Sequence, residues 1–211
     1  YTVTVSGDIE TVGGYSSDKE YISVFTTGEI ERDVSRYINV AKNKPVFGND
    51  KLPQNETYPL SKITDGITAA GNFAMLGGWD SQTGMENERQ YAVIDLLNCY
   101  DVNKVIVYVR DGSGIISGFR MGGQILGSAD SPVIENMNVL ATQADDSLNK
   151  LGAVGTYEFN KTKCRYVAIA NPAGQMSRWG ASICEVEVYA ETKENMYDWS
   201  VMLGGNVEID G

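Results

Sequence analysis

Hydrophobic and polar residues alternate with a period of two in the clearest stretches of the chain. In Lys104–Arg110, Val105, Val107 and Val109 fall on one face and the intervening residues on the other. Ser182–Tyr189 follows the same pattern, with Cys184, Val186 and Val188 alternating with Glu185, Glu187 and Tyr189. A period of two is typical of half-buried antiparallel strands. Both stretches are therefore predicted to be strands with their valines in the core.

Shorter stretches of the same kind recur along the chain, and residues that favour turns separate them. The further strands predicted from pattern are Tyr1–Val5, Tyr21–Thr26, Gln90–Leu97, Met137–Thr142, Thr156–Phe159 and Arg165–Ala170. Loops are predicted over Ser6–Lys19, Lys42–Pro59, Ile67–Arg89, Asp111–Gly118 and Asn171–Ala181, and Thr27–Tyr37 is either a short helix or a linker. Many short strands with few helical patterns predict an all-β sandwich.

Composition narrows the classes of function. The 211-residue chain carries a net charge of −11, which argues against nucleic acid or an anionic membrane surface as a partner. The acidity serves either solubility or metal binding. The chain has no histidine, which removes the commonest general base and most zinc sites. No apolar run approaches the roughly 20 residues that a transmembrane helix needs.

Two glycosylation motifs favour a secreted or cell-surface protein. They begin at Asn55 and Asn160 and lie in stretches rich in turn residues. The first residue is Tyr1 and not Met, so the chain is expected to be a processed product or a fragment. Three cysteines leave at least one unpaired. Cys99 and Cys164 are candidates to pair with each other, and Cys184 is expected to be a buried thiol.

Three sequence patterns resemble a known group of proteins. The stretch from Cys164 to Glu191 reads as "RYV", a Pro/Gly loop and then "CEVEVY"; near residue 38, "INVA" is followed by "KPV"; and Arg120–Ser128, RMGGQILGS, approximates a strand of the pattern R-x-x-G-x-x-I/L-G-x-S. Together they resemble the galactose-binding-like β-sandwiches, which include the discoidin (coagulation factor V/VIII type C) domains and the eel-type fucose lectins. The resemblance covers about residues 38–191 and implies a jelly-roll β-sandwich.

The resemblance implies a calcium site. A carboxylate at the start of a Gly-containing loop suits Ca²⁺, which binds six to eight oxygens, and Asp65 lies in such a position. In the fucose lectins this loop closes on a glutamate directly after the last cysteine, which corresponds here to Glu185. The implied ligands are the carboxylates of Asp65 and Glu185, the backbone carbonyls of Lys62, Ile67 and Cys184, and the side chain of Asp80 or Ser81. The alternative is that Asp65 caps a turn and Glu185 faces solvent.

The resemblance also implies a sugar site. Arg110 and Arg120 bracket a Gly-rich loop, and two guanidinium groups can donate to neighbouring sugar hydroxyls. In the fucose lectins both corresponding arginines contact the sugar; the alternative is a pair of solvated surface arginines. The family histidine falls near Thr83, and the family's adjacent cysteine pair is replaced by Ile115 and Ile116, so fucose specificity is not implied. Trp79 is either a platform for a sugar face or a plug for the sandwich.

Two carboxylates on one predicted strand, Glu185 and Glu187, are candidates for a catalytic pair. Glu185 and Glu187 are about 7 Å apart by the strand rise. Glycosidases place their carboxyl pair across a cleft, so two neighbours on one strand predict a solvated face and no enzyme.

The sequence therefore predicts three regions: an N-terminal extension (1–37), a galactose-binding-like domain (38–191) and a C-terminal extension (192–211). The tail is expected either to pair with Tyr1–Val5 or to form a helix over Lys193–Leu203. The leading hypothesis is a non-catalytic, lectin-like carbohydrate-binding module with structural calcium. The alternative is an adhesion or structural subunit that assembles with protein partners through strands at its termini.

Overall fold

The computed structural model describes residues 2–5, 21–24, 35–48, 58–69, 71–76, 89–112, 118–174 and 181–193. The chain divides into two compact units, Tyr1–Val34 and Ser35–Gly211. In the first unit, strand β1 (Thr2–Val5) pairs antiparallel with β2 (Tyr21–Val24), with Thr2 opposite Val24. The predicted pairing of β1 with the C-terminal tail involves residues outside the described ones.

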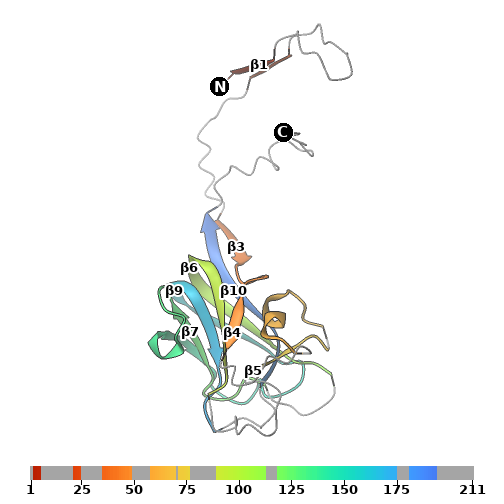
Figure 1. Ribbon diagram of the computed structural model, residues 1–211, viewed down its shortest axis with the longest axis vertical. Helices are drawn as coiled ribbons and strands as arrows, with labels where there is room; N and C mark the ends of the chain where they lie inside the picture. Colours follow the sequence, from red (N-terminus) through yellow and green to blue (C-terminus); the bar gives the residue numbers. More distant parts are fainter. Residues whose placement is uncertain are drawn as a thin grey trace. The chain divides into compact units, whose positions relative to one another are not determined.

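The second unit is a β-sandwich (Figure 1). Its described strands are β3 (Ser35–Asn39), β4 (Val46–Gly48), β5 (Ala74–Leu76), β6 (Tyr91–Val109), β7 (Gln124–Ser128), β8 (Asn138–Thr142), β9 (Val154–Ala170) and β10 (Ala181–Lys193). All pairings are antiparallel, in the order β3-β10-β6-β9-β7-β8, with β4 paired to β6 and β5 to β10. Two short 3₁₀ helices are η1 (Leu60–Thr64) and η3 (Ile134–Asn136).

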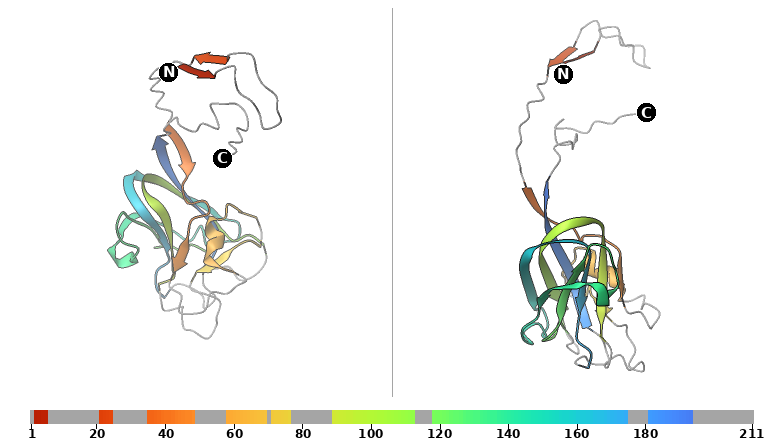
Figure 2. Two further views of the ribbon diagram at one scale, coloured as in Figure 1. Left: turned by 45° about the horizontal axis from the view of Figure 1, so that its top comes forward. Right: turned by 90° about the vertical axis from the view of Figure 1, so that its left-hand side faces the viewer.

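Strands β6 and β9 each contribute to both layers of the sandwich. The first part of β6 pairs with the last part of β9 (Tyr91 with Ala170), and its last part pairs with the start of β9 (Tyr108 with Val154). Between them the register breaks after Asp95, where Leu97 has a φ of 67° and its N–H donates to Asp95 Oδ1 at 2.8 Å. The resulting bend of β6 over the sandwich is visible in Figure 2.

The core lies between the two layers. Val105, Val107, Val186 and Val188 are fully buried, as the alternating pattern predicts, and Ile94 is buried with them from the other half of β6. Each such side chain contributes about 1.5–3 kcal/mol by its removal from water. A second buried cluster is formed by Val93, Leu126, Ile134, Met137, Ala168 and Ala170, of which Ile134 belongs to η3.

One end of the sandwich collects the strand termini that carry the predicted sugar site. Strand β6 both begins and ends there, because it bends over the opposite end. Strand β9 ends there with Ala170 paired to Gln124 at the start of β7, and β10 begins there with Ile183 paired to Val109. We call this the loop end of the sandwich.

Several predicted element boundaries are wrong. Residues 35–37 belong to strand β3 and not to a helix or linker, because they pair with residues 191–193 of β10. Residues 46–48 and 74–76, predicted as loop, form the short strands β4 and β5. The two strands predicted within 90–110 are one continuous strand, and so are the two within 156–170. Short edge strands carry too few residues to display a period of two, so only the pairing with a neighbour reveals them.

Candidate functional site

Arg110 directly follows β6 at the loop end. Its N–H donates to Ser182 O at 3.1 Å, and its carbonyl accepts from Gly152 N at 2.9 Å, which fixes the backbone between two neighbouring strands. The guanidinium carbon lies 4.3 Å from the centroid of the Phe73 ring. Phe73 is buried and stacks on Tyr58 with the ring centroids 4.5 Å apart. Contact with the Phe73 ring therefore holds the Arg110 side chain, in addition to the hydrogen bonds of its backbone.

Arg120 precedes β7 at the same end. Its N–H donates to Asn171 Oδ1 at 2.9 Å, and Asn171 Nδ2 donates to Gly118 O at 3.1 Å. The side chain forms a two-pronged ion pair with Asp146, with Nε 2.8 Å from Oδ1 and Nη2 3.2 Å from Oδ2. Arg110 and Arg120 therefore share one end of the sandwich but rest on different partners. Neighbouring residues hold both arginines, and the choice between a sugar site and a pair of solvated surface arginines stays a prediction.

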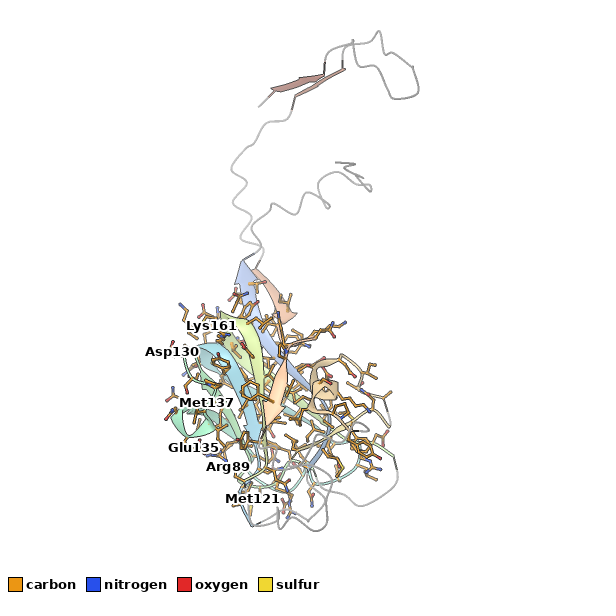
Figure 3. All side chains as sticks on the ribbon, in the orientation of Figure 1. Arg89, Met121, Asp130, Glu135, Met137 and Lys161 are labelled. Atoms are coloured by element: carbon orange, nitrogen blue, oxygen red, sulfur yellow. The ribbon has the colours of Figure 1, made fainter. Side chains whose placement is uncertain are left out.

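Met121 and Arg89 mark the same rim of the molecule (Figure 3). Met121 follows Arg120 and is 48% exposed. Arg89 precedes β6, and its Nη2 donates to Gln124 Oε1 at the start of β7. The remaining members of the predicted sugar site, Trp79 and Thr83, lie outside the described residues, as do Ile115 and Ile116.

The predicted metal loop follows η1. Thr64 anchors it, because its hydroxyl donates to Lys44 O at 2.9 Å and its carbonyl accepts from Asn43 N at 2.6 Å. Asp65 Oδ1 accepts from Ile67 N at 2.8 Å. Gly66 has a φ of 82°, a left-handed conformation that glycine adopts without strain, and its N–H donates to Glu185 Oε2 at 3.1 Å. The fold thus brings Asp65 and Glu185 to one place.

Among the described carboxylates, Glu185 differs from the others because it is fully buried. Its position in the alternating pattern predicts a solvent-facing residue. The register of β10 shifts between Ile183 and Glu185, and the 65–67 turn covers the side chain. The solvent-facing alternative for Glu185 is therefore wrong.

The electrostatic surroundings of Glu185 are unfavourable to its charge. Burial raises the pKa of Glu185 to about 8, and the negative charges of Asp65 and Glu187 add to this, whereas the Gly66 N–H and Lys42 oppose it. Its Oε1 atom is buried without a hydrogen-bond partner. A buried carboxylate oxygen without a partner, next to a second carboxylate, is a site that a hard cation would satisfy.

Three of the other predicted metal ligands, Lys62, Ile67 and Cys184, lie among the described residues. Lys62 lies in η1, Cys184 is buried beside Glu185, and the Ile67 carbonyl accepts from Asn72 Nδ2 at 3.2 Å. Asp80 and Ser81 lie outside the described residues. Within the described ranges, no three cysteine, aspartate or glutamate side chains gather as a metal cluster. Half of the predicted set consists of backbone carbonyls, which such a cluster does not include.

Glu187 has partners of a different kind. Its Oε2 accepts from Tyr108 OH at 2.9 Å and from Tyr189 OH at 3.2 Å. One member of the Glu185–Glu187 pair is thus buried and the other is held by tyrosines on the outer face of the sheet.

Two predictions are wrong: the pairing of Cys99 with Cys164, and the turn-rich surroundings of the Asn160 glycosylation motif. All three cysteines are free thiols, with Cys99 exposed and Cys164 and Cys184 buried, so the predicted Cys99–Cys164 pairing is not formed. Burial and the neighbouring Cys99 raise the pKa of Cys164 to about 11. Asn160 is exposed but lies within β9, not in a turn-rich stretch. Asn55 lies outside the described residues.

Three residues of the site escaped prediction. Asn72 donates to both oxygens of Asp65, at 3.1 and 2.9 Å. Phe73 supports Arg110, and Asp146 holds Arg120. The signal for Asn72 is an amide side chain in the Gly-containing loop, seven residues after Asp65. Asp146 carries no comparable signal, because it comes from the distant connection between β8 and β9.

Comparison with known proteins identifies the fold. No family model matches the sequence, and no curated protein matches it. Among solved structures, CpGH89CBM32-5 from Clostridium perfringens, in complex with GalNAc-beta-1,3-galactose, matches with a TM-score of 0.55 at 21% identity over 74% of this chain and 100% of that chain. An f-lectin (fucolectin) from Morone saxatilis (striped bass) serum matches with a TM-score of 0.55 at 19% identity over 76% and 50%.

A third match is chitosan-binding module 2, in complex with chitotriose, derived from the chitosanase/glucanase of Paenibacillus sp. IK-5. Its TM-score is 0.51 at 19% identity over 72% of this chain and 100% of that chain. The chain is therefore a galactose-binding-like β-sandwich over about three quarters of its length. Within the described ranges, no helix is long and apolar enough to cross a membrane.

Proposed function

We propose that the sandwich is a non-catalytic carbohydrate-binding module that holds a glycan at its loop end, with a calcium ion ordering the 62–67 loop. The observation that carries the proposal is the joint placement of Arg110 and Arg120 at the loop end of a fold whose solved neighbours bind glycans. Guanidinium groups with fixed orientation suit the hydroxyl pairs of a sugar.

The metal part of the proposal rests on Glu185. A Ca²⁺ ion would be held by the carboxylates of Asp65 and Glu185 together with the carbonyls of Lys62, Ile67 and Cys184, with Asp80 or Ser81 as the remaining predicted ligand. The partnerless Glu185 Oε1 and its neighbour Asp65 support this assignment. The ion would neutralise the buried carboxylate and hold the loop against β10, which keeps the loop end ordered.

The positions of the Glu185 and Glu187 carboxylates support a non-catalytic role. Glu185 is buried beneath the 65–67 turn, and the Glu187 carboxylate is occupied by two tyrosine hydroxyls. Within the described ranges, neither carboxylate has the open arrangement across a cleft that glycoside hydrolysis requires. A secreted or cell-surface location belongs to the same proposal, and the exposure of Asn160 in its motif is compatible with it.

The test is a glycan array probed with the full chain, once in calcium and once in a chelator. The array should include neutral galactosides, fucosylated glycans and chitooligosaccharides. Binding that chelation weakens is the expected result. Binding that chelation leaves unchanged would keep the glycan site and remove the supporting role of calcium. No binding in either condition would overturn the proposal and turn attention to assembly with protein partners, measured by the oligomeric state of the full chain.

A further inference from the structure

The Asp146 carboxylate binds both the side chain of Arg120 and the backbone beside it. Oδ1 accepts from Arg120 Nε at 2.8 Å and from Met121 N at 2.9 Å, and Oδ2 accepts from Arg120 Nη2 at 3.2 Å. The ion pair is partly open to solvent, since 26% of the Arg120 side chain and 46% of the Asp146 side chain are exposed. One carboxylate therefore fixes both the orientation of the guanidinium plane and the start of the turn that carries it.

The loop that carries Asp146 is itself tied to the core. Buried Tyr157 donates to Gln143 Oε1 at 2.5 Å, and Gln143 Nε2 donates to the Asp145 carbonyl at 2.9 Å. The backbone of Gln143 also pairs with the Arg120 turn, through Gly122 N to Gln143 O at 2.8 Å and Gln143 N to Gly123 O at 2.7 Å. The position of Asp146 is thus set by the sandwich before any ligand arrives.

The charges around Arg120 are not those of an anion site. The Arg120 ion pair and the Met121 N–H lower the pKa of Asp146, and hydrogen bonds from Ser147 lower the pKa of Asp145. Asp146 is therefore ionised at neutral pH against the Arg120 guanidinium, and the ionised Asp145 is its neighbour in the chain. The negative charges of Asp145 and Asp146 would repel a ligand carboxylate or sulfate that approaches Arg120, whereas they would not repel a neutral hydroxyl.

We propose that Asp146 is a positioning residue that presents Arg120 to the ligand and cancels its charge, so that the loop end selects neutral glycans over anionic ones. This inference rests on the proposed function. It assigns a ligand class, neutral sugars whose hydroxyls accept from an oriented guanidinium, and it makes selectivity depend on a residue that contacts the sugar only through Arg120.

The experiment compares wild type with Asp146→Asn, which keeps the shape and removes the charge. Affinity is measured for the best neutral glycan from the array and for the same glycan carrying a sialic acid or a sulfate. We expect the variant to lose about tenfold in affinity for the neutral glycan, the size of one charge-assisted hydrogen bond. The preference for neutral over anionic glycan should fall by at least the same factor. A purely structural role would weaken both ligands equally and leave their ratio unchanged.

Three further variants keep the inference falsifiable. Asp130→Asn removes an exposed carboxylate away from Met121 and the loop end (Figure 3), and it should leave both affinities and their ratio unchanged. Asp146→Glu keeps the charge, so it should keep the wild-type ratio even if affinity changes. In an Arg120→Ala background, Asp146→Asn should cause no further loss of neutral-glycan affinity.

An unchanged ratio in Asp146→Asn, or the same loss without Arg120, would overturn the inference while leaving the glycan-binding function in place. If the wild-type chain binds none of the glycans, the proposed function fails and the inference fails with it. The two failures are therefore distinguishable. Thermal unfolding of each variant confirms that folded proteins are being compared.

Discussion

Glu185 Oε2 accepts a hydrogen bond from the backbone N–H of Gly66 at 3.1 Å, although the two residues are 119 positions apart in the chain. The contact joins strand β10 to the 65–67 turn and buries a carboxylate next to Asp65. Without a cation this arrangement disfavours the ionised form of Glu185, because the carboxylate is held away from water beside a like charge, and its raised pKa keeps it largely protonated at neutral pH. A cation bound by both carboxylates would hold the 65–67 turn against strand β10.

Calcium is expected to stabilise the wild-type protein. At a concentration about 100 times the dissociation constant, the gain is about 2.7 kcal/mol, which corresponds to a rise of roughly 5–10 °C in the unfolding temperature of a domain of this size. Differential scanning fluorimetry in calcium and in chelator measures it. Glu185→Gln should lose the response and should be no less stable than wild type in chelator at neutral pH, since a neutral amide replaces a carboxyl group that burial keeps largely protonated.

Glu187→Gln is the matched control for Glu185→Gln. It changes the next outward-facing glutamate of β10, which binds tyrosine hydroxyls and not the 65–67 turn. It should retain the full calcium response. A calcium response that survives Glu185→Gln would remove Glu185 from the metal site.

The stability of the calcium-free protein should fall as the pH rises from about 5 to 9. The pKa of Glu185 is raised to about 8 in the folded protein from an ordinary value of 4.5. Between these values the folded protein keeps a proton that the unfolded chain has lost, so acidification favours the folded state. Unfolding temperatures in chelator at several pH values provide the measurement.

Glu185→Gln is expected to flatten this pH trend, and saturating calcium is expected to reduce it in the wild type. The aspartates with lowered pKa values, including Asp95 and Asp146, titrate below this window and so do not mask the effect. An equally steep trend in Glu185→Gln would assign it to another group.

Arg110→Ala should weaken glycan binding by about tenfold or more, the scale of a lost charge-assisted hydrogen bond. The fold should persist, because the core valines of β6 and β10 do not depend on this side chain. Isothermal titration with the best array glycan gives the affinity, and thermal unfolding reports the fold. Arg165→Ala is the control, because Arg165 pairs with Asp95 at the bend of β6, opposite the loop end. Unchanged affinity in Arg110→Ala would remove this arginine from the glycan site.

The cysteines should differ in reactivity. In the native protein at neutral pH, iodoacetamide should modify Cys99 and leave Cys164 and Cys184 intact, since Cys99 alone of the three thiols is exposed and burial raises the pKa of the other two. Intact mass should rise by one adduct in buffer and by three in denaturant. Failure of Cys99 to react in buffer would indicate that it is paired or covered.

The sequence by itself determined the fold class and the strands of the core. The alternation in 104–110 and 182–189 places Val105, Val107, Val186 and Val188 on buried faces, because a period of two on a twisted sheet leaves one face for the core. The sequence also singled out Arg110 and Arg120 as candidates for a sugar site, and the structure places both at the loop end; their role in sugar binding stays a prediction.

Only the tertiary structure decided which distant residues contact and hold the side chains that the sequence pattern singled out. Pattern placed Glu185 on the solvent side of its strand, but a register shift in β10 and a turn from residues 65–67 bury it. Asp146 and Phe73 lie far in sequence from the arginines that they hold. Contacts of this kind leave no local periodicity, because they depend on how distant connections meet at one end of the sandwich and not on the alternation within any strand.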